Sequence, residues 1–370
     1  MSLNTVVSIG GGWQQEESII ACLEYGLDVV IIEQGNLSKK LRRKCKLISC
    51  SFNETDFIFN EIRKIKNLIG AFAFNNEIGQ ILAEKINCEI NSIFCRKINL
   101  KILRNKFFFK DLINTKEINV PRLFLIESPE NIDEVYNLCR NFTVIVKPND
   151  SSGSRGISLL PDEASLNDFK ETVNFALKKS RDGKAIIEEF IFGDEYSVEG
   201  YVNCKGTSEV LKISRRELRE GTFSASSIYN ISEDNKVFKL ISAYIQSIFH
   251  NIEIKPTLYH IEVKVNDKGV FLIDVGFRGG GYFVADFLVG ESIKMNLNLF
   301  FILNVLGYQT KIKSDNKIRA VSFSELSAHK LASQHEMEIT RIYRLINNNL
   351  FDSKDDSFRD VVVFLEKIRK

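Results

Sequence analysis

The sequence predicts a multidomain fold of mixed α/β and α+β class, in which a Rossmann-like domain precedes a region of antiparallel β-structure. Apolar runs alternate with a helical stripe over residues 5–33, as in a βαβ unit. Residues 258–278 contain two strand-like runs around a tight turn, which indicates an antiparallel hairpin. A chain of 370 residues is long enough for the cores of two or three domains.

The N-terminal unit begins with a strand at residues 5–9, which ends in the glycine run Gly10–Gly12. The helix after it should end at Gly26, and the next strand covers residues 29–32. The apolar stripe of this helix consists of Ile19, Ile20 and Leu23. These elements predict a parallel βαβ arrangement.

The glycine run raises the alternative of a nicotinamide oxidoreductase built on residues 1–120. The dinucleotide fingerprint Gly-x-Gly-x-x-Gly needs a third glycine, and that position is Gln15. Binding of NAD(P)H would support this alternative.

Glu77 follows a predicted strand at residues 71–74 and precedes a helix. Ligands of open parallel sheets bind at the carboxyl ends of the strands, so Glu77 is a candidate substrate contact. The alternative is an acid in the first turn of a helix that complements the helix dipole.

The hairpin places two acids face to face. A three-residue loop at Asp267–Gly269 puts Glu262 directly opposite Asp274. Oxygen ligands suit a hard cation, Mg²⁺ or Mn²⁺, and Arg278 adds a positive group for an anion. The alternative is a solvated face of an ordinary hairpin. Leu258, His260, Glu262 and Lys264 share this face, and Tyr259, Ile261 and Val263 share the other.

A second segment has the features of a phosphate site. The apolar strand at residues 144–148 carries Lys147 near its end and enters a loop of small residues. Such a loop lets backbone N–H groups approach phosphate oxygens, and lysine supplies a charge. The alternative is a plain flexible loop. The loop residues expected at the phosphates are Ser152, Gly153, Ser154 and Gly156.

A third segment follows at residues 185–199, where an apolar strand leads through an acid pair and a turn into a second strand. Backbone atoms around Glu189 and Ile191 can read adenine, and Glu195 beyond the turn can accept from ribose hydroxyls. Taken alone, this segment also fits an ordinary strand–turn–strand.

The order of the three segments resembles the ATP-grasp superfamily, and nearly the whole chain fits that pattern. The resemblance implies a pre-ATP-grasp domain over residues 1–113 and an ATP-grasp domain over 114–305, with a lid subdomain at about 122–195. It implies a small C-terminal domain over residues 306–370.

The resemblance also implies roles for single residues. Lys106 and Lys147 match lysines that contact the nucleotide phosphates, and residues 150–156 match a glycine-rich lid. Glu262 and Asp274 match the magnesium ligands.

At the other end of the nucleotide, Glu188, Glu189 and Ile191 match the adenine-reading hinge, the last two through backbone atoms. Glu195 matches the ribose-binding acid, and Arg278 matches the arginine that steadies an acyl phosphate.

The implied activity is that of an ATP-dependent ligase. It activates a small carboxylate as an acyl phosphate, joins it to an amine, and releases ADP and phosphate. His260 and Gly280 are further candidates for substrate contact, although His260 fits a satisfied polar neighbour equally well. The layout is similar to glycinamide ribonucleotide synthetase, biotin carboxylase and the L-amino acid ligases. A ligase of the glycinamide ribonucleotide synthetase, carbamoyl phosphate synthase or biotin carboxylase type is therefore the alternative.

One position departs from the pattern. Many relatives carry Asn two residues after the second metal acid, and here that residue is Gly276, which has no side-chain oxygen. A further alternative is therefore an ATP-binding protein whose catalysis is weakened.

Charge, hydropathy and cysteine content bear on the class of partner and on the cellular location. The 50 basic and 48 acidic residues are nearly balanced, which argues against nucleic acid as the main partner. No long apolar run indicates a membrane span, and the N-terminus lacks a signal-peptide pattern. The seven cysteines have no metal or disulfide spacing, so we expect reduced thiols and a cytoplasmic location. Family habit favours a homodimer.

Overall fold

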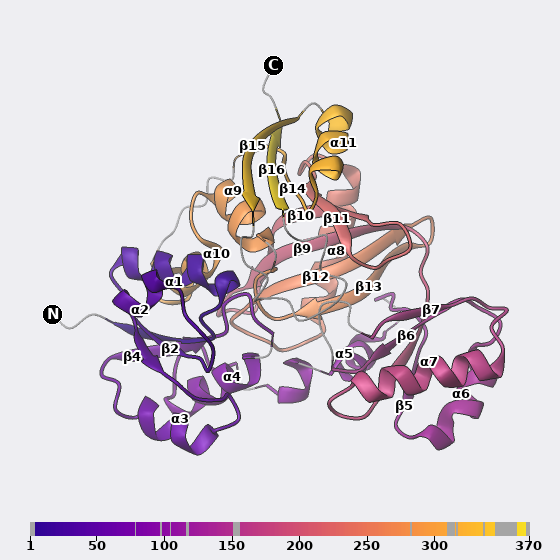
Figure 1. Ribbon diagram of the computed structural model, residues 1–370, viewed down its shortest axis with the longest axis horizontal. Helices are drawn as coiled ribbons and strands as arrows, with labels where there is room; N and C mark the ends of the chain where they lie inside the picture. Colours follow the sequence, from indigo (N-terminus) through magenta and orange to yellow (C-terminus); the bar gives the residue numbers. More distant parts are fainter. Residues whose placement is uncertain are drawn as a thin grey trace.

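The structure is a computed structural model (Figure 1). It describes residues 4–77, 79–96, 98–103, 105–115, 118–150, 156–281, 283–308, 315, 317–335, 337–344 and 361–367. Within these ranges, no helix combines the length and the apolar character that crossing a bilayer requires.

The N-terminal domain is a parallel four-stranded sheet in the order β3-β2-β1-β4. Its strands are β1 (Thr5–Ile9), β2 (Asp28–Ile32), β3 (Lys46–Ile48) and β4 (Leu68–Phe72). Its helices are α1 (Trp13–Tyr25), α2 (Lys39–Lys44), α3 (Thr55–Ile62) and α4 (Gln80–Glu89). The predicted βαβ unit is confirmed, and α1 ends at Gly26, whose φ of 97° suits glycine.

A second sheet forms a separate small unit, which lies on the right in Figure 1. Its four antiparallel strands have the order β5-β8-β6-β7. They are β5 (Leu123–Ile126), β6 (Val144–Pro148), β7 (Ser158–Leu160) and β8 (Ala185–Glu189). The helices α6 (Ile132–Cys139) and α7 (Leu166–Lys179) pack on it around Val146, Phe169 and Ile187. The strand bounds of β6 and β8 agree with the apolar runs in the sequence.

The large sheet has eight strands in the order β13-β12-β9-β10-β11-β14-β16-β15. Five of them are β9 (Asp194–Val202), β10 (Ser208–Leu218), β11 (Ala225–Asn230), β12 (Thr257–Asn266) and β13 (Gly269–Gly276). The C-terminal segment adds β14 (Arg319–Ser322), α11 (Glu325–His335), β15 (Met337–Arg344) and β16 (Val361–Lys367). The C-terminal strands thus extend the large sheet instead of forming a sheet of their own.

Short elements connect these sheets and support the large one. They are η1 (Leu100–Leu103), α5 (Lys106–Ile113), η2 (Pro129–Asn131) and α8 (Lys236–His250). The core on one face of the large sheet includes Tyr259, Ile261 and Val263 of β12, all fully buried, together with α8. This agrees with the predicted apolar face of the hairpin.

The hairpin register is confirmed, but its turn is not the predicted one. Glu262 pairs with Asp274 across β12 and β13. The turn has two residues between the paired Asn266 and Gly269, instead of the predicted three. A bulge at Ile273 adds one residue farther along, so the register at the acids is the expected one.

The apolar stripe of Ile293, Leu297 and Phe300 predicts a single helix from about 291 to 306, and this prediction is wrong. The chain forms a π-helix, η3 (Val284–Gly290), then α9 (Glu291–Ile293) and α10 (Leu297–Val305). Lys294 has a φ of 57°, which breaks the helix. Asn296 then caps α10 by accepting from the backbone of its first turn.

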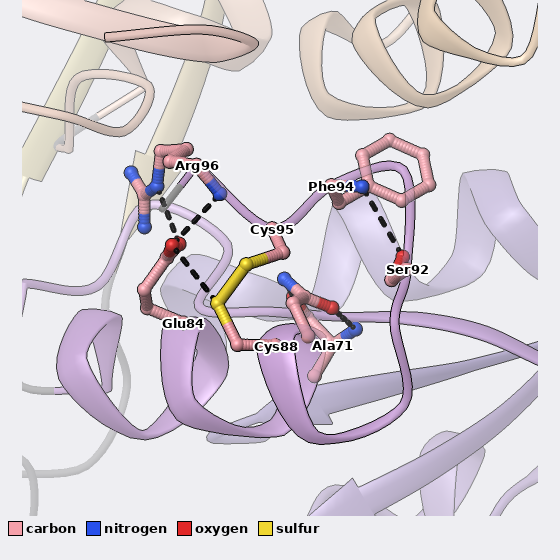
Figure 2. The surroundings of a disulfide bond; sticks show 8 residues. Ala71, Glu84, Cys88, Ser92, Phe94, Cys95 and Arg96 are labelled. Carbon is pink, nitrogen blue, oxygen red and sulfur yellow. Dashed lines mark hydrogen bonds and ion pairs between the residues drawn. A yellow bond between two sulfur atoms is a disulfide. The ribbon is translucent and has the colours of Figure 1, made fainter. Parts of the chain in front are cut away.

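The expectation that all cysteines are reduced is also wrong. Cys88 at the end of α4 forms a disulfide with Cys95, and the two Cα atoms are 4.9 Å apart (Figure 2). Cys22, Cys45, Cys50, Cys139 and Cys204 are free.

Asp286 of η3 lies where the N-terminal domain meets the large sheet. Its carboxylate accepts from Asn75 at 3.4 Å and from Asn296 at 3.0 Å. No lysine or arginine in the described ranges pairs with it. Burial, together with the charge of Glu17, raises the pKa of Asp286 to about 7.

This carboxyl should make the stability of the protein depend on pH. A pKa raised above the unfolded value adds stability that is present below about pH 4 and is lost as pH rises through about 7. We expect Asp286→Asn to remove this loss. The melting temperature of the variant minus that of the wild type should therefore rise by about 2–4 °C when the pH is raised from 5 to 8.

Thermal melts at both pH values, with Asp267→Asn in the exposed hairpin turn as the matched charge control, test this. An Asp286→Asn offset that is the same at both pH values would contradict it.

Candidate active site

Polar side chains form ordered rows across one face of the large sheet. The central row runs from Ser214 to Ser197, Glu262 and Asp274, which are register partners on β10, β9, β12 and β13. Alternate residues of a strand share a face. The acids of β9, β12 and β13 therefore lie on the same face as Arg216 of β10. The polar side chains of this row therefore lie on the face opposite the core of Tyr259, Ile261 and Val263.

The two acids of the central row are each paired with a cation from elsewhere. Lys106, at the start of α5, donates to both oxygens of Asp274 at 2.5 and 2.6 Å. Arg216 of β10 forms an ion pair with Glu262. Burial alone would raise the pKa of Asp274, but Lys106 and Lys147 outweigh it and hold that pKa well below its usual range.

Two facing carboxylates make a suitable place for a divalent metal ion. Both acids offer oxygen ligands, which Mg²⁺ and Mn²⁺ prefer. Gly276 lies beyond them on β13 and offers no side-chain ligand. A Cβ at Gly276 would lie 3.5 Å from the Arg278 guanidinium carbon.

Glu188 lies between two buried lysines. It accepts from Lys110 at 2.7 Å and pairs with Lys147 at 2.8 Å, and all three side chains are less than a tenth exposed. Burial would raise the pKa of Glu188, but the two lysines lower it. Burial and the charge of Lys147 lower the pKa of Lys110 to about 7, and the attraction of Glu188 offsets this only in part.

The predicted adenine hinge has a buried side and an exposed side. Glu188 turns inward to the lysines, whereas Glu189 reaches the exposed Arg122 at 3.4 Å. Ile191 is buried, and Lys264 lies over the ring of Phe190 at 4.1 Å.

The acid expected at the ribose, Glu195, lies beside Arg216, with 3.1 Å between its Oε1 and the arginine Nε. Arg216 therefore contacts both Glu195, near the start of β9, and Glu262 of the central row. Both Glu195 and Arg216 are mostly buried.

Most of the expected phosphate loop lies outside the described residues, including Ser152, Gly153 and Ser154. Gly156 is described and has a φ of 77°. A Cβ there would lie 2.8 Å from the ring of Pro148, so both its conformation and its space favour glycine.

The structure brings Glu77 and Arg278 together from different domains. Their closest atoms, Oε2 and Nη2, are 3.5 Å apart, and Arg278 also donates to the Gly279 carbonyl at 2.9 Å. The Nε of Arg278 is buried, and the described part of the chain gives it no acceptor.

His260 and Gly280 are held by a buried acid, Glu199. His260 Nδ1 is hydrogen-bonded to Glu199, and the Gly280 N–H donates to the other oxygen of the same carboxylate at 3.0 Å. His260 Nε2 faces Glu262 at 3.5 Å. A Cβ at Gly280 would lie 2.6 Å from Glu199, so glycine allows this close approach.

Sequence reasoning missed Lys110 and Glu199. It predicted that Arg216, after a strand at residues 209–214, either binds an anionic substrate or lies at a solvated strand end, and it did not predict the pairing with Glu262. Lys110 lies four residues after Lys106 on one helix, and Glu199 lies four residues after Glu195 on one strand. Both spacings place the second residue on the same face as the first, which was a usable signal.

A family model of the ATP-grasp domain matches residues 140–286. A glutathione biosynthesis bifunctional protein, GshAB, from Clostridium perfringens is 32% identical over 102 residues, which are 27% of this chain and 12% of that protein. Dapdiamide A synthase from Enterobacter agglomerans is 23% identical over 206 residues, 54% of this chain and 48% of that protein. The chain thus spans less than half the length of these curated relatives.

The fold matches over a greater length. The crystal structure of an L-amino acid ligase from Bacillus licheniformis superimposes with a TM-score of 0.76 at 15% identity. The match covers 99% of this chain and 94% of the ligase chain. This likeness confirms the predicted fold class, including the Rossmann-like first domain.

The buried Glu188 should be essential for stability, because its loss leaves Lys110 and Lys147 without a partner. We expect Glu188→Gln to lower the free energy of unfolding by about 3–5 kcal/mol in urea denaturation. The neighbouring Glu189→Gln removes only an exposed contact to Arg122 and should cost about 0–1 kcal/mol. Equal effects of the two substitutions would refute this interpretation.

Proposed function

We propose that the protein is an ATP-dependent ligase. The premises are that residues 140–286 match the ATP-grasp domain and that the whole chain has the fold of an ATP-grasp ligase. It activates a small carboxylate as an acyl phosphate and joins it to an amine, with release of ADP and phosphate. The observation that carries this proposal is the pairing of the facing acids Glu262 and Asp274 with Arg216 and Lys106.

The nucleotide lies between the small sheet and the large sheet in this proposal. Adenine meets the backbone around Glu189 and Ile191, and Glu195 binds the ribose hydroxyls. Lys106, Lys147 and Arg216 turn from their carboxylates to the phosphate oxygens of ATP. These three cations come from separate elements that already converge on one face.

The reaction then has two steps. An oxygen of the substrate carboxylate attacks the γ-phosphorus of ATP, and the bond from that phosphorus to ADP breaks, so the electron pair leaves with ADP. The amine next attacks the acyl carbon, the C–O bond to phosphate breaks, and the nitrogen loses a proton. Arg278 lies beside the acyl phosphate and stabilises its charge.

A divalent ion fits the oxygen atoms of Glu262 and Asp274, and when bound it neutralises charge on the phosphates. Gly276 provides no further side-chain ligand, so Glu262 and Asp274 are the residues that would hold the ion. Glu77, His260 and Gly280 surround the end of the site where the carboxylate and the amine meet.

The decisive test measures ADP release from Mg-ATP across a panel of amino acids and small carboxylates, offered singly and in pairs. We expect turnover that requires one acid and one amine. Asp274→Asn should lower kcat by about 10²–10³-fold, because it weakens both the metal site and the Lys106 contact. Asp267→Asn, in the turn of the same hairpin, should leave kcat unchanged.

Two outcomes would count against ligase activity. ATP binding without turnover on any pair would support the alternative of an ATP-binding protein with weakened catalysis, for which Gly276 is the structural reason. Failure to bind ATP at all would refute the assignment of the nucleotide site.

Arg278 should act on the carboxylate and not on the nucleotide. We expect Arg278→Gln to lower kcat/KM for the carboxylate by about 10²-fold while the Kd for ATP stays within threefold. Steady-state kinetics and calorimetry separate the two effects, with the exposed Arg140→Gln as the control. A large loss of ATP affinity would place Arg278 in the nucleotide site instead.

A further inference from the structure

The Cys88–Cys95 disulfide closes a short loop at the edge of the N-terminal domain (Figure 2). Cys88 lies in the last turn of α4, and Cys95 lies seven residues later. Neither cysteine is buried, so a small thiol reagent can reach the bond.

The residue after Cys95 connects this loop to the candidate active site. Arg96 donates to Glu84 from its backbone N and from its Nε, both at 2.7 Å. Its Nη1 lies 3.3 Å from Thr257 Oγ1 and 3.5 Å from the carbonyl of Phe277. Phe277 immediately precedes Arg278, so Arg96 bridges α4 and the segment that carries Arg278.

The same carboxylate lies beside the disulfide. Glu84 Oε1 accepts from the Arg96 backbone and is 3.5 Å from Cys88 Sγ. A disulfide sulfur has no proton to donate, whereas a thiol has one. Reduction therefore creates a donor that competes with Arg96 for Glu84, and it removes the covalent link between Cys95 and α4.

The rest of the loop has its own attachments. Ser92 donates from its backbone to the Asn87 carbonyl at 2.8 Å and from its side chain to the Ile69 carbonyl at 2.5 Å. Phe94 is buried against Phe72, with ring centroids 4.8 Å apart. Opening the disulfide therefore changes the Cys95–Arg96 end without unfolding the loop.

We propose that Cys88 and Cys95 form a reversible redox modification site whose state sets the contact between Arg96 and the Phe277–Arg278 segment. A low-molecular-weight dithiol reduces the site: the Sγ–Sγ bond breaks, each sulfur gains one proton and one electron, and the dithiol closes to its own disulfide. An oxidised dithiol reverses the step. The disulfide form holds Arg96 in place, and the dithiol form releases it.

The test equilibrates the full chain in buffers of graded reduced-to-oxidised dithiol ratio. Free thiols are alkylated and located by mass spectrometry, and amide hydrogen exchange is followed in parallel. We expect Cys88 and Cys95 to titrate together, with loss of exchange protection in residues 95–96 and 274–280 on reduction. Protection of β8 should not change, which gives an internal control.

Variants separate the disulfide from other thiols. Cys88→Ser and Cys95→Ser should show the reduced exchange pattern at every dithiol ratio, and Cys204→Ser should behave as the wild type. The wild-type titration stands without the variants if one of them folds poorly.

The inference is overturned if Cys88 and Cys95 keep one state at all ratios, or if they titrate while residues 274–280 keep their protection. Both readouts are independent of the proposed ligase activity, so failure of one proposal leaves the other to be judged separately.

Discussion

Charge compensation in the buried space between the two antiparallel sheets is the constraint on which the site depends. Lys106, Lys110 and Lys147 share this space with Glu188 and Asp274. A buried charge costs several kcal/mol unless it is paired, so the helix α5, the small sheet and the hairpin must meet in one arrangement. Three lysines thus share two acids in this space, and the pKa of Lys110 is lowered to about 7.

The large sheet orders the second half of the site. Alternation along β12 sends Tyr259, Ile261 and Val263 to the core with α8, and His260 and Glu262 to the opposite face. Strand register then decides which polar groups meet, as in the row that ends at Glu262 and Asp274. Glu199 adds a link from this face to the glycine run after Arg278, so the loop is held by the sheet and not by its own conformation.

Much of this was predictable from local pattern. The βαβ unit and the strands at 144–148 and 185–189 follow from periodicity. The pairing of Glu262 with Asp274 was also predicted, but from a three-residue turn that the structure does not have. The two-residue turn and its compensating bulge could not be predicted, because no local pattern marks the extra residue. Without the bulge, the two-residue turn would pair Glu262 with Ile273. The pairing of Lys110 with Glu188 depends on how α5 packs against β8, and the two residues are 78 positions apart in the sequence. The disulfide depends on a distance of 4.9 Å between Cα atoms, which spacing among seven cysteines does not reveal.

The shared eight-stranded sheet also limits how the chain can be divided. A fragment limited to residues 140–286 would keep β9 to β13 but lose β14, the hydrogen-bonding neighbour of β11. The N–H and C=O groups of β11 that now face β14 would become an open edge, which invites pairing between molecules. The same fragment would lack α5 and leave Glu188 with one lysine instead of two. The smallest autonomous folding unit is therefore larger than the segment in which sequence similarity is concentrated.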